Sequence, residues 1–364
     1  MKIGVPKEIK PQENRVGLIP SGVYQLTQRG HEVLVQQGAG LGSGYEDVDY
    51  ERAGARLVRA AAEIFQTAEM IVKVKEPLAE EYRQLRKGQI LFTYLHLAAN
   101  RDLTEGLLAS GVTAIAYETV QVSRRLPLLE PMSEIAGRMS VIVGGCYLAK
   151  NHGGKGVLLG GVPGVLPGRV VVIGGGTAGV NAARMAAGLG ADATILEVDI
   201  ERMRFLDITM HATHTLFSSP TNLADLLPSV DLLVGAVLLP GARAPKLITR
   251  EMLGRMKPGS VFVDIAIDQG GCAETSRPTT HDDPVYEENG VLHYCVTNMP
   301  GAYARTATQA LTNATFTHVQ LLADHGWGEA VRVQPALASG INIHEGHVTC
   351  EAVADSFGLE WVEI

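Results

Sequence analysis

Three side chains that could bind or protonate a substrate stand where short apolar segments of the sequence end. Lys75 ends "IVKVK", His96 ends "ILFTYLH", and Arg15 follows the first apolar segment. If these segments are parallel strands, their carboxyl ends meet at one edge of a sheet, where open α/β sheets bind ligands. Two cations bind a carboxylate strongly, and an imidazole transfers protons near neutral pH. We therefore expect a small carboxylate substrate at this edge, bound by Arg15 and Lys75.

Each candidate also has a simpler interpretation. A histidine at the end of a strand is more often structural, and a lone lysine is more often solvated. Asp268 presents the same choice in the second half of the chain, in "VDIAIDQGG" (263–271), where an apolar segment runs into a loop. Its carboxylate could orient a water or an amine, or it could cap the turn formed by the glycines that follow.

The stretch "VVIGGGTAG" (171–179) has the glycine spacing that binds the pyrophosphate of a dinucleotide. Gly174, Gly176 and Gly179 form G-x-G-x-x-G between an apolar segment and a helical one. The first glycine permits a tight turn, the second lets the backbone approach the phosphates, and the third lets the helix pack closely on the strand. The helix amino terminus adds unpaired N–H groups and partial positive charge. This context predicts a dinucleotide site.

Glu197 indicates which dinucleotide binds. It ends the next apolar segment, 18 residues after Gly179. A carboxylate at this place can accept a hydrogen bond from the ribose 2′-hydroxyl and repels a 2′-phosphate, so NAD is favoured over NADP. Asp199 and Arg202 lie close by and leave NADP open, because an arginine can bind a phosphate.

Short β-branched runs alternate with helical stretches along both halves of the chain. This alternation is typical of right-handed βαβ units around parallel sheets. The predicted fold class is therefore α/β, with two Rossmann-like, doubly wound parallel-sheet domains. We expect strands at 2–6, 31–38, 70–75, 89–96 and 112–118, and again at 169–175, 191–199, 230–237, 260–267 and 291–298.

Two longer helical segments, at 131–151 and 305–326, mark the boundaries between the domains. The residues after 310 show no further strand pair, so we expect them to return to the first domain. The substrate domain is then discontinuous. It comprises residues 1–130 plus 307–364, and the cofactor domain comprises residues 131–306.

The composition argues against several classes of function. The 364 residues carry a formal net charge of −8 and no run of Lys or Arg, which disfavours nucleic acid as a partner. The amino terminus lacks the apolar core of a signal peptide, and no apolar run is long enough to span a bilayer. The four cysteines have no CxxC or CxxH spacing. We therefore expect reduced thiols in a cytoplasmic protein, and no metal site.

Longer strings, spread over nearly the whole chain, carry a resemblance to a known family. They include "GVPKEIKPQENRVGLIPSGV", "LFTYLHLA", "PMSEIAGR", "VVIGGGTAGVNAA", "DIAIDQGGC" and "SRPTTHDDP". The sequence resembles the alanine dehydrogenases, within the family that they share with the NAD-binding subunit of nicotinamide nucleotide transhydrogenase. The resemblance implies reversible, NAD-dependent oxidative deamination of L-alanine to pyruvate and ammonium. It also implies a homo-oligomer, since family members are commonly hexamers.

The resemblance gives a role to each candidate residue. Arg15 and Lys75 match the residues that bind the substrate carboxylate, and His96 and Asp268 match the acid–base residues. The family's cofactor contacts fall on Ser133, Gly174, Gly176, Thr177, Ala178, Gly179, Glu197, Arg202, Ser218, Val237, Leu238, Ile265, Ala266, Ile267, Asp268, Arg277, Val296, Thr297, Asn298 and Met299.

Three alternatives remain open at this point. The chain could be a transhydrogenase-like NAD-binding subunit that acts with a membrane partner, although it keeps Arg15, Lys75 and His96. It could be a dehydrogenase of another small amino acid, because the shape of a pocket cannot be read from the sequence. It could also be a non-catalytic NAD-binding protein, which predicts the loss of one of the four polar groups, and none is lost.

Overall fold

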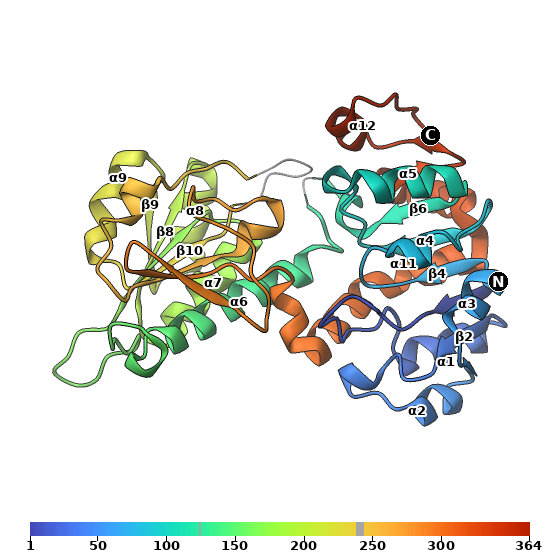
Figure 1. The fold of residues 1–364 in the computed structure, drawn as a ribbon, viewed down its shortest axis with the longest axis horizontal. Coiled ribbons are helices and arrows are strands. Elements are labelled where there is room, and N and C mark those ends of the chain that lie inside the picture. The colour runs from blue at the N-terminus through green and yellow to red at the C-terminus, as the bar shows by residue number, and fades with distance from the viewer. Residues whose placement is uncertain (124, 238–243) are drawn as a thin grey trace. The chain divides into compact units, whose positions relative to one another are not determined.

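The structure, a computed structural model, describes residues 1–123, 125–237 and 244–364. The chain forms two compact units, each built around its own sheet (Figure 1). The first unit comprises Met1–Met132 and Gly301–Ile364, and the second comprises Ser133–Pro300. The first unit is therefore discontinuous in sequence.

The sheet of the first unit is parallel in its central part. Its parallel strands are β1 (Lys2–Val5), β2 (Glu32–Gln36), β3 (Arg56–Val58), β4 (Met70–Val72), β5 (Ile90–Thr93) and β6 (Thr113–Ala116). They lie in the order β6-β5-β4-β1-β2-β3, so the chain moves outward from β1 in one direction and from β4 in the other. Every residue of β4, β5 and β6 is buried, as expected for strands covered on both faces. In such a doubly wound sheet, ligands bind beyond the carboxyl ends of the strands at the reversal, here β1 and β4.

The expectation of no strand pair after residue 310 is wrong. A hairpin of β14 (Ile341–His344) and β15 (His347–Val348) extends the first sheet, and β14 pairs antiparallel with β6. Its turn uses Glu345 and Gly346 with φ of 44° and 85°, the conformation of a two-residue hairpin loop. Strands this short carry too little alternation to be recognised by pattern. The tail does return to the first unit, as expected.

Local causes set the ends of the helices in the first unit. The side chain of Asn100 caps α5 (Arg101–Ser110) by accepting the N–H of Leu103, and the helix ends at Gly111 in the left-handed conformation. The other helices of this unit are α1 (Pro20–Gln28), α2 (Asp47–Arg52), α3 (Ala61–Thr67), α4 (Ala79–Tyr82), α11 (Ala304–Val333) and α12 (Glu351–Phe357).

The sheet of the second unit repeats the doubly wound arrangement. Its parallel strands are β7 (Arg169–Ile173), β8 (Asp192–Glu197), β9 (Thr213–Phe217), β10 (Leu232–Gly235), β11 (Val261–Asp264) and β13 (Val291–Tyr294). They lie in the order β13-β11-β10-β7-β8-β9, and β12 (Val285–Glu288) adds an antiparallel edge next to β13. The reversal falls between β7 and β10, which makes the carboxyl ends of these two strands the expected ligand site.

Alternate residues of β7 pack into two different cores. Val170 and Val172 pack with Ala182 on one face of the sheet, and Val171 and Ile173 pack with Leu223 on the other. This alternation follows from the two-residue period of a strand, and it explains why the whole strand is apolar. The helices of this unit are α6 (Glu130–Tyr147), α7 (Thr177–Gly188), α8 (Ile200–Thr209), α9 (Pro220–Leu226) and α10 (Arg250–Leu253).

The predicted α/β fold class with two Rossmann-like domains is confirmed, with antiparallel strands added at one edge of each sheet. The strands that the sequence did not predict, β3, β9 and β12, also lie at the edges. They bury fewer residues than the central strands, and so they lack the apolar runs that identify the others.

Candidate active site

Arg15 and Lys75 follow the two strands at which the order of the first sheet reverses. Arg15 lies in the loop after β1, and Lys75 lies three residues beyond the end of β4. His96 lies three residues beyond the end of β5, the strand next to β4. All three therefore follow the carboxyl ends of adjacent parallel strands, as the sequence predicts.

Arg15 is 2% exposed and is held by Glu13. Its Nε donates to Oε1 of Glu13 at 2.7 Å, and its Nη2 donates to Oε2 at 2.6 Å. Its Nη1 lies 3.0 Å from the sulfur of Met132. Burial lowers the pKa of Arg15, but the bonds and charge of Glu13 outweigh this and raise it. Sequence reasoning missed Glu13, although it stands two residues from Arg15.

Lys75 has a fixed backbone and an ammonium that makes no hydrogen bond or ion pair with the residues that the structure describes. Thr93 Oγ1 donates to the carbonyl of Lys75 at 3.0 Å. The residue is 9% exposed, and among the described residues its ammonium has no hydrogen bond or ion pair. A nearly buried cation is costly unless a counter-charge meets it, so this position suits an anionic ligand.

Glu118 fixes the backbone of His96. Its carboxylate accepts the N–H of His96 at 2.6 Å and that of Leu95 at 3.0 Å. His96 has φ of 49°, in the left-handed region that residues other than glycine rarely adopt. Its ring stacks on Tyr94, with centroids 5.9 Å apart, and 41% of its side chain is exposed. The imidazole is therefore held in place and still accessible.

Shared neighbours bring these three residues into one electrostatic environment. Burial raises the pKa of Glu76, but the charges of Lys75, His96 and Lys10, together with a hydrogen bond from Lys10, outweigh this and lower it. One oxygen of Glu76, Oε2, is buried without a hydrogen-bond partner among the described residues. Burial raises the pKa of Tyr94, the residue on which His96 stacks, and the charge of Arg15 partly offsets this.

The glycine turn of the second unit is shaped for a dinucleotide. Gly174 has φ of 100°, and a Cβ there would lie 2.7 Å from the carbonyl oxygen of Ala236. A Cβ on Gly179 would lie 1.8 Å from the carbonyl oxygen of Gly174, so the third glycine is needed for close packing. Among the described residues, by contrast, no atom lies within 4 Å of a Cβ on Gly176, and no side chain caps the amino terminus of α7. Unpaired N–H groups beside open space are what a pyrophosphate requires. Thr177 and Ala178 are the first two residues of this helix.

Glu197 binds the glycine turn as well as ending β8. Its carboxylate accepts the N–H of Gly175 at 2.7 Å and those of Val198 and Asp199 at 2.7 and 3.1 Å. A carboxylate offers about four acceptor positions, so capacity remains for a ribose hydroxyl. Arg202 Nε donates to the carbonyl of Gly175 at 2.7 Å. Both side chains thus support the turn, which sequence reasoning did not foresee.

A buried carboxylate, Asp264, organises the loop that carries Asp268. Asp264 ends β11 and is fully buried; it accepts the N–H of Ala266 at 3.0 Å and that of Cys272 at 2.9 Å. These bonds hold the 3₁₀ helix Ile265–Gln269, in which Asp268 is exposed. Burial raises the pKa of Asp264, and the bonds that it accepts offset this in part.

Two further cofactor candidates lie near the glycine turn. Ser133 lies one turn before Gly137 on α6, and a Cβ on Gly137 would lie 2.1 Å from the carbonyl oxygen of Ala178. Residues four apart share a helix face, so Ser133 lies on the face of α6 that carries Gly137. Val237 follows β10 directly beyond Ala236. Leu238 lies outside the described residues.

The remaining candidates follow other strands of the same sheet. Ser218 follows β9, and its N–H donates to the carbonyl of Glu197 at 2.8 Å. The run Val296–Met299 follows β13. Arg277 lies over the ring of Tyr286, 3.9 Å from its centroid. The candidates after β7, β8, β9, β10, β11 and β13 therefore all follow the carboxyl ends of parallel strands.

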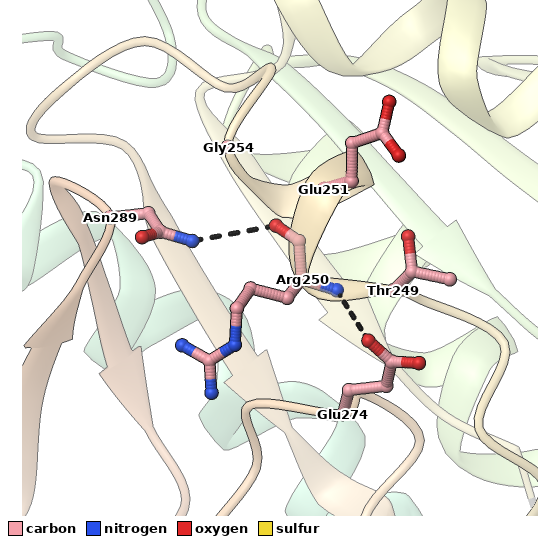
Figure 2. A pocket seen from close by; sticks show the side chains of 6 residues that line it. All are labelled: Thr249, Arg250, Glu251, Gly254, Glu274 and Asn289. Atoms are coloured by element: carbon pink, nitrogen blue, oxygen red, sulfur yellow. Dashed lines mark hydrogen bonds between the residues drawn. The ribbon is translucent and has the colours of Figure 1, made fainter.

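A shallow depression elsewhere on the second unit contains none of these residues. Thr249, Arg250, Glu251, Gly254, Glu274 and Asn289 line it (Figure 2). The backbone N–H of Arg250 donates to Glu274 at 2.8 Å, and its carbonyl accepts from Asn289 at 3.4 Å. These bonds tie the start of α10 to its neighbours.

Other features bear on metals, membranes and redox state. Within the ranges that the structure describes, no group of three or more His, Cys, Asp or Glu side chains could hold a metal ion. In the same ranges, no helix is both long and apolar enough to cross a membrane. Cys146, Cys272, Cys295 and Cys350 are all free thiols.

Known proteins match the chain over its full length. The N-terminal domain model of "Alanine dehydrogenase/PNT" matches residues 4–136, and its C-terminal domain model matches residues 140–351. The chain is 58% identical to the alanine dehydrogenase of Halomonas elongata, covering 100% of this chain and 98% of that protein. It is 57% identical to that of Bacillus subtilis, covering 100% and 96%.

Solved structures agree with these matches. A structure of L-alanine dehydrogenase superposes with a TM-score of 0.94 at 51% identity, covering 98% of this chain and 99% of that one. A transhydrogenase from Sinorhizobium meliloti superposes with a TM-score of 0.83 at 26% identity, covering 96% and 100%. The alanine dehydrogenase is thus the nearer of the two in sequence and in structure.

The two doubly wound units and the glycine turn define an oxidoreductase of the Rossmann type that uses a nicotinamide dinucleotide. Within that class, the chain belongs to the alanine dehydrogenase/PNT family.

Proposed function

We propose that the chain catalyses the reversible oxidative deamination of L-alanine to pyruvate and ammonium, with NAD as the hydride acceptor. The observation that carries the proposal is the ammonium of Lys75. It is nearly buried at the reversal of the first sheet and makes no hydrogen bond or ion pair among the described residues, although the charge of the neighbouring Glu76 acts on it. Relatives that are 53–58% identical over the whole chain and are named alanine dehydrogenases support this choice.

The two units have separate tasks in this proposal. The first unit, Met1–Met132 and Gly301–Ile364, binds the substrate, with Arg15 and Lys75 on the substrate carboxylate. The second unit, Ser133–Pro300, binds the dinucleotide. The amino terminus of α7 binds the pyrophosphate. The carboxylate of Glu197, which has acceptor capacity left, accepts a hydrogen bond from the adenosine ribose.

The chemistry requires orientation of the substrate and movement of protons. A bound nicotinamide would supply the acceptor for the hydride that leaves the alanine Cα. Arg15 and Lys75 fix the carboxylate and thereby the direction of the Cα–H bond. The oxidised substrate is an imine, to which one water adds. His96 and Asp268 take and return the protons as water adds and as ammonium leaves.

A transhydrogenase-like role is the second candidate function. The structural likeness at 26% identity is the observation in its favour. The identity to alanine dehydrogenases is about twice as high, and Arg15, Lys75 and His96 are present. We therefore favour the dehydrogenase.

The test is the formation of NADH by the purified chain. Alanine should support turnover with NAD, and pyruvate with ammonium should consume NADH. Serine, glycine, 2-aminobutyrate and valine are the comparison substrates. If any of these has a higher kcat/KM than alanine, that amino acid and not alanine is the preferred substrate. No turnover with any amino acid, together with binding of NAD, would favour the transhydrogenase-like or non-catalytic role.

We further propose that the chain is a homo-oligomer of the cytoplasm. Leu158, Val162, Val165 and Leu166 are exposed on one short segment of the second unit, and Leu166 is 89% exposed. Such a patch marks an interaction site more often than a free surface, and sedimentation would give the size of the assembly. The four free thiols are typical of a reducing compartment.

A further inference from the structure

Beyond β4, the chain continues as Lys73, Val74 and Lys75 without regular strand pairing on one side. Toward β5 the backbone bonds continue, because Lys73 N–H donates to Phe92 O at 3.1 Å and Tyr94 N–H donates to Val74 O at 3.2 Å. Toward β1 the pairing register covers only Met70 and Ile71. Something other than the strand must hold that side.

The side chain of Glu8 takes this place. Its Oε1 accepts the N–H of Val74 at 2.6 Å and lies 3.4 Å from the N–H of Lys75. Glu8 follows β1, so its carboxylate stands where the missing backbone acceptors of that strand would be. With Thr93 on the carbonyl of Lys75, both backbone polar groups of the lysine have a side-chain neighbour.

Lys73 supplies the counter-charge that this arrangement needs. Its ammonium is fully buried, 3.1 Å from Oε2 of Glu8 and 2.7 Å from Oε1 of Glu81. Burial raises the pKa of Glu8, and the charge of Lys73 works against this. The second oxygen of Glu81 accepts the N–H of Leu78 at 2.9 Å, at the start of α4.

We propose that Glu8 is a positioning residue for substrate binding. It fixes the backbone that carries Lys75, and thereby the point at which the first unit meets the substrate carboxylate. This inference rests on the proposed function, because it assumes that Lys75 binds that carboxylate.

The chain provides a matched control in Glu81. Each of the two carboxylates places one oxygen on the ammonium of Lys73 and the other on a backbone N–H. A glutamine at either position must turn its NH₂ group toward the Lys73 ammonium or toward the backbone N–H. Both variants therefore place two donors against each other and lose one hydrogen bond. The two variants differ in the backbone segment that loses its hydrogen bond. Glu8→Gln frees the segment of Lys75, and Glu81→Gln frees the start of α4.

The experiment compares KM and kcat of Glu8→Gln and Glu81→Gln, for alanine and for pyruvate, with thermal unfolding of both. We expect Glu8→Gln to raise both KM values about tenfold, since part of a charge-assisted bond is lost. Its kcat should change by less than about threefold, because substrate binding and not proton transfer is affected. Glu81→Gln should lower the unfolding temperature to a similar extent and leave both KM values near those of the parent.

Equal changes of KM in the two variants, or a loss confined to kcat, would overturn the inference while leaving the proposed function standing. A parent chain without turnover of alanine would overturn both. If Glu8→Gln does not fold, Glu8→Asp replaces it. The aspartate keeps the charge beside Lys73 and is too short to reach Val74 as well, so the same rise in KM is expected, and a KM like that of the parent would refute the role of Glu8.

Discussion

Glu13 binds the guanidinium of Arg15 through both carboxylate oxygens, at 2.7 Å to Nε and 2.6 Å to Nη2. The planar two-donor edge of the arginine is therefore engaged within the protein. The sequence predicts that Arg15 binds the substrate carboxylate, and the structure shows that Glu13 fixes the orientation of its guanidinium.

Arg15→Lys should damage the enzyme because of this pair. A lysine presents a point charge and cannot bind both oxygens of Glu13 in one plane. The buried carboxylate then lacks a bond, at a cost of about 1–3 kcal/mol. We expect a lower unfolding temperature and a higher KM for alanine. An unchanged KM beside a lowered unfolding temperature would show that Arg15 is structural.

Lys75→Ala should weaken the binding of carboxylate substrates in particular. The loss of one charge-assisted bond predicts a fall in kcat/KM for alanine of about tenfold to a hundredfold. Alaninamide, which has the same Cα–H and amine, should be a very poor substrate of the parent. The dissociation constant of NAD should stay close to that of the parent, because the glycine turn belongs to the other unit. A parent that uses alaninamide as well as alanine would exclude a carboxylate site at Lys75.

His96→Ala and Asp268→Ala should each lower kcat by about 10²–10⁴-fold, the range for positioned acid–base groups. The two variants differ in what else they disturb. His96 lies in the first unit, so NAD binding should persist, whereas Asp268 stands in the loop after β11 among the cofactor candidates. Near-parental turnover of His96→Ala would make this residue a structural histidine, held by Glu118.

Much of this site could be predicted because strand ends are visible in the sequence. Apolar runs identify buried parallel strands, and the residue types that follow each run identify candidates at the ligand edge. The glycine turn was equally visible, because only glycine fits at Gly174 and Gly179.

The supporting carboxylates could not be predicted in the same way. Four carboxylates accept a backbone N–H group from a candidate residue or from the residue next to one: Glu8, Glu13, Glu118 and Asp264. Nothing in the local sequence distinguishes them from solvated acids, since their partners are fixed only when the chain folds. The string "KVK" shows the same limit: Lys73 is a buried structural cation and Lys75 a candidate binding residue, although the two are chemically identical.

Acid should weaken one contact within the first unit, between Asp324 on α11 and two residues near β2. The hydrogen bonds from Arg29 lower the pKa of Asp324 from its ordinary 3.8, burial acts in the opposite direction, and His31 adds a bond at 2.9 Å. A lowered folded pKa stabilises the protein above the unfolded pKa, and this contribution is lost as the pH falls through the folded value. Asp324→Asn should therefore unfold at a lower temperature than the parent at pH 7, and the difference should shrink below about pH 4. A difference that is constant from pH 7 to pH 3 would contradict this.

Glu197 makes the sharpest prediction about the cofactor. Its carboxylate already accepts three backbone N–H groups at the glycine turn, so Glu197→Ala should loosen the turn as well as remove the ribose partner. We expect weaker binding of NAD and a relative gain for NADP, because the negative charge that repels a 2′-phosphate is gone.

Glu197→Gln separates the loosening of the turn from the loss of the ribose partner. The glutamine keeps an acceptor for one side of the turn but has no charge. Its preference for NAD over NADP should therefore fall, while its unfolding temperature should fall less than that of Glu197→Ala. The measurement is kcat/KM for NAD and for NADP in the parent and both variants. A parent that works faster with NADP at equal concentration would refute this assignment, and Arg202, bound to the same turn through Gly175, would then be the residue that accepts the phosphate.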